Sequence, residues 1–151
     1  MARYCTACLS KPCRNALKTL KMVMFPIISD QRPTVGFQPN RNLLPVMVYI
    51  HGGGYSYGSG DTVGPKRFMR HDVILVTFNY RLGLLGFLST GDESLPGNYG
   101  LLDQITALRW VRTHIRDFGG NPDMVTIFGD SAGGASVNLL MMSPRATSKF
   151  L

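Results

Sequence analysis

The feature that most constrains the fold is a serine framed by glycines, which stands between an apolar run and a segment of small residues. Residues 125–128 read Val-Thr-Ile-Phe and residues 129–134 read Gly-Asp-Ser-Ala-Gly-Gly. Gly129 and Gly133 allow a strand to turn sharply into a helix, while Ser131 is held strained with its hydroxyl over the sheet. The pattern is typical of a nucleophile elbow, although a bare Gly-x-Ser-x-Gly also arises by chance in glycine-rich loops.

A second glycine-rich turn precedes the elbow by about 80 residues. Residues 46–50, Val-Met-Val-Tyr-Ile, predict a strand buried on both faces, and residues 51–54, His-Gly-Gly-Gly, follow it directly. Acyl transfer needs a nucleophile, a base, and hydrogen-bond donors placed where the carbonyl oxygen becomes negative. Ala132 at a helix start supplies one backbone donor, and glycines without Cβ atoms let a substrate approach others. The two sites together predict an acyl-transfer centre with Ser131 as nucleophile.

The order of the predicted elements indicates an α/β fold. Strands are expected over residues 46–50, 73–80 and 125–128, and helices over residues 66–71, 101–118 and 132–142. Strand, short helix, strand, long helix, strand, helix is the order of a right-handed, mostly parallel sheet with helices on both faces. The long connection over residues 81–100 carries five glycines and is expected to serve a site or to pack as an ordered loop.

The first 42 residues differ in character from the rest. They contain four prolines and, apart from a short helical pattern over residues 15–24, no sustained hydrophobic period. We expect residues 1–42 to form an irregular or disordered head and residues 43–151 to form the folded domain. An odd number of cysteines with no histidine before His51 argues against a four-ligand zinc site in the head, where all three lie: Cys5, Cys8 and Cys13.

The net charge of +7 is concentrated in the same head. Residues 1–42 hold seven Lys or Arg against one acidic residue, whereas residues 43–151 hold nine against eight. No aromatic side chains interleave with the basic ones to form a stacking platform, so we expect no nucleic-acid partner. Residues 16–28 only loosely imitate a signal peptide, and no apolar run reaches the ~20 residues of a membrane span. No cofactor or metal is expected.

Six motifs between residues 44 and 144 carry a resemblance to a known family. They are HGGGY at 51–55, NYRLGLLGFLS at 79–89, PGNYGLLDQ at 96–104, ALRWV at 107–111, FGGNP at 118–122 and VTIFGDSAGG at 125–134. This part of the chain resembles the type-B carboxylesterase and cholinesterase family of α/β hydrolases, and its motifs are most similar to those of the insect-type carboxylesterases. The resemblance implies a partial α/β-hydrolase domain over residues 43–151, a serine esterase mechanism through an acyl-enzyme, and a small carboxylic ester as substrate.

Carried over position by position, the resemblance implies roles for several residues. Ser131 is the nucleophile, and the oxyanion hole is formed by the N–H groups of Gly53, Gly54 and Ala132. Asp130 occupies the acidic position near the acyl pocket, or merely ends a strand. His51 is interpreted as an anchor of the glycine turn rather than as the base.

Arg81 and Asp103 resemble the family's internal ion pair beneath the site, and we expect them to be a buried pair that holds the loop to the helix.

Two departures from the family matter as much as the match. The triad acid and histidine follow the serine in this fold, yet residues 132–151 contain no Asp, Glu or His. The head shows no SEDCLYLN-like strand. We therefore interpret the chain as an N-terminal fragment that is inactive alone, with a non-catalytic interaction homologue or a non-functional truncation as alternatives.

Overall fold

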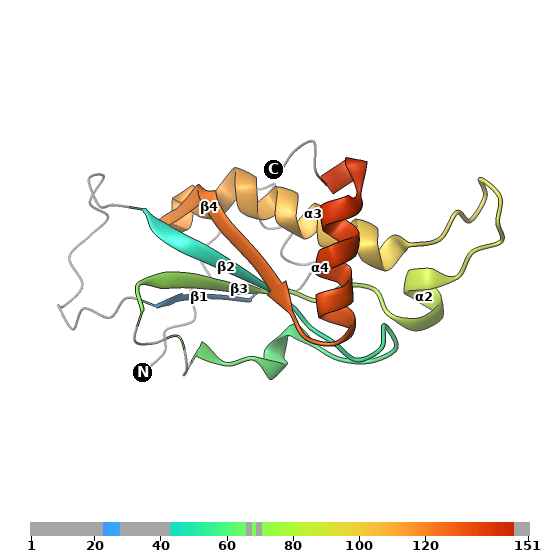
Figure 1. The fold of residues 1–151 in the computed structure, drawn as a ribbon, viewed down its shortest axis with the longest axis horizontal. Helices are drawn as coiled ribbons and strands as arrows, with labels where there is room; N and C mark the ends of the chain where they lie inside the picture. The colour runs from blue at the N-terminus through green and yellow to red at the C-terminus, as the bar shows by residue number, and fades with distance from the viewer. Residues whose placement is uncertain (1–22, 28–42, 66–67, 69–70, 147–151) are drawn as a thin grey trace.

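A four-stranded sheet forms the centre of the computed structural model, which describes residues 23–27, 43–65, 68 and 71–146. The sheet has the order β1-β3-β2-β4 (Figure 1). Strands β2, β3 and β4 run parallel, and β1 pairs antiparallel with β3. Their bounds are Val23–Ile27 for β1, Leu44–Ile50 for β2, Val73–Thr77 for β3 and Gly120–Gly129 for β4.

Two long helices cover one face of the sheet. Helix α3 spans Tyr99–His114 and ends through the 3-10 helix η3, Ile115–Phe118, while α4 spans Ala132–Met142. Side chains from both helices join the side chains that β2 and β3 direct to this face in one buried cluster, which contains Val46, Val48, Ile50, Ile74, Val76, Ile105, Leu108, Val111 and Leu140. The main core of the described residues therefore lies between the sheet and these two helices.

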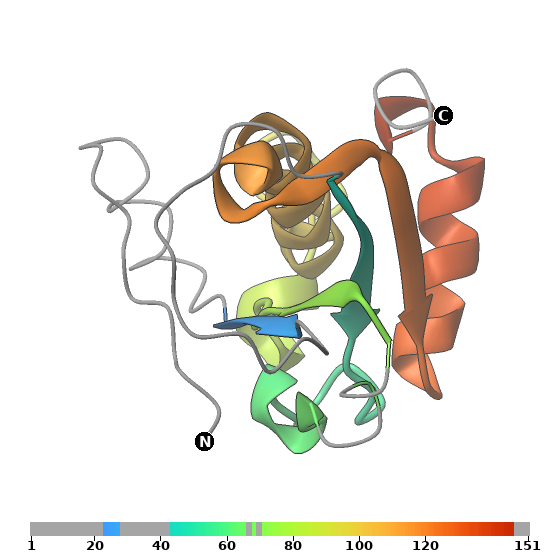
Figure 2. The ribbon, with the colours of Figure 1, turned by 90° about the vertical axis from the view of Figure 1, so that its left-hand side faces the viewer.

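The opposite face carries the connection from β2 to β3. Within the described residues, its only helix is the short 3-10 helix η1, Gly60–Thr62, and Figure 2 shows α3 and η1 on opposite sides of the sheet. The chain crosses the sheet in one direction from β2 to β3 and in the other from β3 to β4. Right-handed crossovers then place the two connections on opposite faces. The helix expected over residues 66–71 falls mostly outside the described residues.

Strand β1 differs from the irregular head that the sequence predicts. Its five residues pair with β3 along the outer edge of the sheet, with Pro26 opposite Ile74. Proline is tolerated on an edge strand because the missing N–H can face away from the ladder. The strand escapes sequence reasoning because Pro26 interrupts its pattern. The other residues of the head, including the three cysteines, lie outside the described part of the chain.

The connection over residues 81–100 contains an element that the sequence analysis did not predict. Helix α2, Gly83–Phe87, forms early in this connection and contacts α3. The remainder turns around Asp92, whose carboxylate accepts hydrogen bonds from the Thr90 hydroxyl and from the N–H groups of Ser94 and Leu95. The expectation of an ordered loop is therefore met, and α3 begins at Tyr99, two residues before the predicted start.

Candidate active site

Ser131 stands at the junction of β4 and α4, on the carboxyl edge of the parallel strands. Its backbone has φ 51° and ψ −121°, outside the regions that residues with a Cβ normally occupy. The side chain is exposed, whereas Ala132 next to it is buried. A strained serine between a strand and a helix is the geometry that the Gly-x-Ser-x-Gly pattern predicts.

The glycines of the elbow are required by close packing against the end of β2. A Cβ added to Gly133 would lie 2.0 Å from the carbonyl oxygen of Ile50, and one added to Gly129 would lie 2.5 Å from the same oxygen. Neither contact is physically allowed, because real Cβ atoms do not approach backbone oxygens below about 3 Å. The missing side chains thus let the elbow lie directly against β2, where the second glycine turn begins.

The glycine turn over residues 51–54 lies beside Ser131. A Cβ added to Gly52 would lie 3.2 Å from Cβ of Ser131 and 2.8 Å from the carbonyl oxygen of Asp130. Gly53 and Gly54 have φ values of 109° and 57°, which glycine adopts without the penalty of a Cβ. The structure therefore brings together the two motifs that the sequence separates by about 80 residues.

His51 is enclosed beneath the turn, and only 1% of it is exposed. Its Nδ1 lies 2.8 Å from the carbonyl oxygen of Gly52, to which it can only donate. The imidazole stacks on Tyr80 at 4.4 Å, and the Tyr80 hydroxyl donates to the carbonyl oxygen of His51 at 2.8 Å. These contacts favour the interpretation of His51 as an anchor of the turn.

Asp130 is held by a residue that sequence reasoning missed. The hydroxyl of Tyr49, on β2, donates to Oδ1 of Asp130 at 2.6 Å. Burial, followed by this hydrogen bond, raises the pKa of Tyr49. The carboxylate next to Ser131 is therefore oriented from the neighbouring strand. The only sequence signal was a tyrosine two residues before the glycine turn.

Arg81 and Asp103 form the predicted ion pair, but the pair is not buried. The Arg81 Nε lies 2.7 Å from Oδ2 of Asp103, and Nη2 lies 2.8 Å from Oδ1. The Arg81 side chain is 50% exposed and that of Asp103 17% exposed. The Arg81 guanidinium also lies over the Tyr99 ring, 4.9 Å from its centre. Hydrogen bonding to Asp103 raises the pKa of Arg81. The pair links the loop to α3 as expected, from a surface position.

Because of Tyr80, we expect the folded chain to lose stability at alkaline pH. Burial raises the pKa of Tyr80 from 10 to about 12, so the folded state favours the neutral phenol. This contribution is fully present below pH ~10 and is lost as the pH rises through about 12. We expect the free energy of unfolding to fall between pH ~10 and about 12, and Tyr80→Phe to make this fall with pH less steep. Urea unfolding at several alkaline pH values measures the free energy. An equally steep fall in Tyr80→Phe would show that Tyr80 is not its cause.

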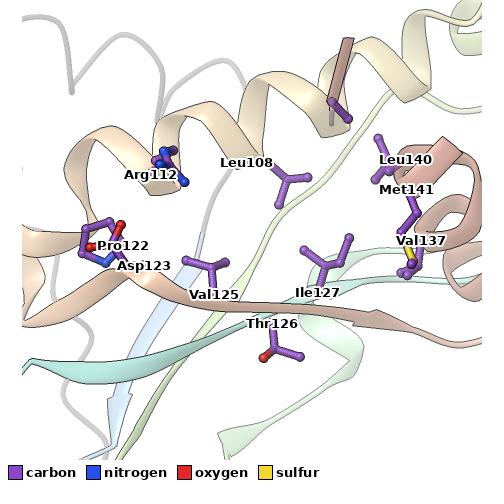
Figure 3. A pocket seen from close by; sticks show the side chains of 11 residues that line it. Leu108, Arg112, Pro122, Asp123, Val125, Thr126, Ile127, Val137, Leu140 and Met141 are labelled. Carbon is purple, nitrogen blue, oxygen red and sulfur yellow. The ribbon is translucent and has the colours of Figure 1, made fainter. Parts of the chain in front are cut away.

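A cavity of about 330 Å³ lies away from Ser131, between α3, β4 and α4. Figure 3 shows Val125 and Ile127 directed into it from β4, with Thr126 on the other side of the strand. Neither Ser131 nor the glycine turn lines it.

Among the described residues, no helix is both long and apolar enough for a membrane crossing, and the same residues hold no group of three metal-ligating side chains.

A strained serine at a strand-to-helix turn, next to a glycine turn at the end of the neighbouring parallel strand, is an arrangement typical of the α/β-hydrolase fold. The chain belongs to the carboxylesterase family, whose model matches residues 28–151. This match begins well before residue 43, where the sequence analysis placed the start of the folded domain. The predicted fold class and family are thereby confirmed.

Relatives from insects are among the most similar proteins. The chain is 58% identical over 111 residues to a carboxylic ester hydrolase from Bombus ignitus, covering 74% of this chain and 20% of the relative. It is 57% identical over 110 residues to a juvenile hormone esterase from Tribolium castaneum, covering 72% and 19%. The chain thus spans about a fifth of the length of the curated relatives that it matches.

Solved structures agree with this assignment. The juvenile hormone esterase from Manduca sexta, solved with OTFP covalently attached, has a TM-score of 0.67 and 51% identity over 70% of this chain and 20% of its own. A carboxylesterase from Geobacillus stearothermophilus has a TM-score of 0.74 and 41% identity over 87% of this chain and 28% of its own. Both support the α/β-hydrolase arrangement of the described residues.

Proposed function

We propose that this chain supplies the nucleophile and oxyanion half of a serine carboxylic ester hydrolase. The observation that carries the proposal is the strained Ser131 in contact distance of the glycine turn. The Ser131 hydroxyl attacks the carbonyl carbon of a small carboxylic ester, the alcohol leaves, and water later releases the acid from the acyl-enzyme. The N–H groups of Gly53, Gly54 and Ala132 stabilise the negative oxygen that forms in both steps.

The other site residues have supporting roles in this proposal. Asp130, oriented by Tyr49, places a negative charge beside the acyl group and the elbow. The ion pair of Arg81 and Asp103 holds the loop after β3 against α3. This loop contacts the end of the glycine turn through the hydrogen bond from the N–H of Gly83 to the carbonyl oxygen of Tyr55. No step of the proposed reaction needs a cofactor or a metal.

The 151-residue chain by itself should show no steady turnover. In α/β hydrolases the triad acid and histidine follow the serine, and residues 132–151 contain no Asp, Glu or His. Without a base, the Ser131 hydroxyl stays protonated and is a weak nucleophile. Turnover of a chromogenic short-chain ester by the purified chain, abolished by Ser131→Ala, would contradict this expectation.

The enzymatic role is tested in a chimera. The matched 111 residues of the Bombus ignitus carboxylic ester hydrolase are replaced by the corresponding segment of this chain, and hydrolysis of p-nitrophenyl acetate is measured. We expect kcat/KM within about tenfold of the unmodified relative, because the two sequences are 58% identical over the exchanged segment. A folded chimera without turnover would favour a non-catalytic role. The unmodified relative, prepared in parallel, is the control for the assay.

A further inference from the structure

The residue after the glycine turn, Tyr55, has an unusual backbone. Gly53, Gly54 and Tyr55 have φ values of 109°, 57° and 59° in succession. The two glycines adopt such values freely, whereas a tyrosine there is strained. Strained residues persist only where the surrounding structure over-determines them, so the contacts of Tyr55 show what holds the turn in place.

Three contacts from different parts of the fold hold Tyr55. Its carbonyl oxygen accepts a hydrogen bond from the N–H of Gly83 at 2.7 Å. Its ring lies 5.0 Å from the ring of Phe87, tilted by 56°. Its hydroxyl accepts a hydrogen bond from the Ser136 hydroxyl at 3.3 Å. The last contact alone reaches across the core to the helix that begins at the nucleophile.

The Ser136 hydroxyl is itself oriented by a buried amide. The side-chain Nε2 of Gln104, on α3, donates to Oγ of Ser136, on α4, at 3.1 Å. Both residues are fully buried, and buried polar groups are strongly driven to keep their partners. The Ser136 hydroxyl in turn donates to the Tyr55 hydroxyl. The three side chains form a one-way chain of hydrogen bonds from α3 through α4 to the turn.

We infer that Gln104, Ser136 and Tyr55 are positioning residues that hold the oxyanion N–H groups of Gly53 and Gly54 in register with Ser131. Ser136 lies on α4, five residues after Ser131, which is the N-cap of that helix. The hydrogen bonds therefore tie both halves of the site to one rigid element. This inference rests on the proposed function. It adds that the donors are fixed through side chains that never touch the substrate.

The test replaces the nucleophile by sulfur, so that no triad base is needed. In the Ser131→Cys chain, the thiolate at position 131 is acylated by p-nitrophenyl acetate, with p-nitrophenolate leaving and a thioester forming through a negative carbonyl oxygen. Alkylation of the same thiolate by iodoacetamide displaces iodide and forms no such oxygen. Both reactions need the thiolate, so the ratio of their rates cancels any change in its pKa. Mass spectrometry of the tryptic peptide around position 131, which has no native cysteine, separates it from the head cysteines.

Tyr55→Phe removes only the hydroxyl and should lower the acylation-to-alkylation ratio about tenfold, since full loss of one oxyanion donor typically lowers a rate by ~10² to 10³. Ser136→Ala should lower it at least as much, because it also removes the acceptor of Gln104. The double variant should lower the ratio no further than Ser136→Ala, because both changes break the hydrogen bond between Ser136 and Tyr55. Tyr57→Phe, at a tyrosine 74% exposed on the same loop, is the matched control and should leave the ratio unchanged.

A ratio within twofold of the parent in Tyr55→Phe, or a double variant whose loss is the product of the single losses, would overturn the inference. If Tyr55→Phe unfolds the chain, the alkylation rate at position 131 rises to the value measured in urea. The acylation-to-alkylation ratio of Ser136→Ala then tests the inference by itself. Failure of the proposed function looks different: the folded Ser131→Cys parent would then show the same ratio as in urea.

Discussion

In the chimera, Ser131→Ala is expected to lower kcat/KM for p-nitrophenyl acetate by at least about 10⁴-fold. Removal of the nucleophile of a serine hydrolase leaves only the catalysis provided by the oxyanion donors and by substrate binding. The side-chain oxygen is the single group lost, because alanine keeps the Cβ. The comparison therefore isolates the chemistry of Ser131 from the shape of the elbow.

Stability serves as the control for this result. Ser131→Ala retains the strained backbone, so the free energy of unfolding should stay within about 1 kcal/mol of the parent chimera. Steady-state kinetics and urea unfolding on the same preparations separate the two effects. If the folded variant retains activity within tenfold of the parent chimera, Ser131 is not the nucleophile.

Gly133→Ala is expected to destabilise the chain by more than about 3 kcal/mol. The added Cβ would lie 2.0 Å from the carbonyl oxygen of Ile50 and 2.9 Å from its carbonyl carbon. Both are backbone atoms in β2, so no flexible side chain can move aside. The elbow would have to separate from β2, and this would also move Ser131 away from the glycine turn.

Gly134→Ala is the matched control, one residue further along α4. The nearest atom to its added Cβ is the carbonyl oxygen of Gly129 at 3.3 Å. This tight contact is offset by the gain of about 0.5–1 kcal/mol from replacing a helical glycine by alanine. Urea unfolding of the two variants should therefore give clearly different midpoints. Equal midpoints would show that the elbow does not depend on contact with β2.

The local elements of the fold could be predicted because their signals lie within short windows. Helix α4 has the predicted bounds, since small residues begin it and Pro144 follows its end. The predicted β-branched and apolar runs form β2, which begins two residues earlier than predicted, and β3, which ends at Thr77, three residues before the predicted end. Strand β4 begins five residues earlier than predicted, because Pro122 suggested a turn where the strand had already started.

The contacts that complete the site could not be predicted, because they join residues far apart in sequence. Tyr49 and Asp130 are separated by 81 positions, as are Tyr55 and Ser136. Such pairs follow from the strand order, which local periodicity does not encode. The prediction that Arg81 is buried was wrong for the same reason, because its burial depends on which elements cover the end of β3.

The backbone at Ser131 has an evolutionary consequence. Its φ of 51° and ψ of −121° would be reached at lower cost by glycine, and such strain in a residue with a Cβ costs of the order of 1–3 kcal/mol. Selection for stability alone would favour glycine at this position. In the proposed enzyme, a serine there marks a stability–activity trade-off, in which part of the folding free energy is given up to present one hydroxyl group.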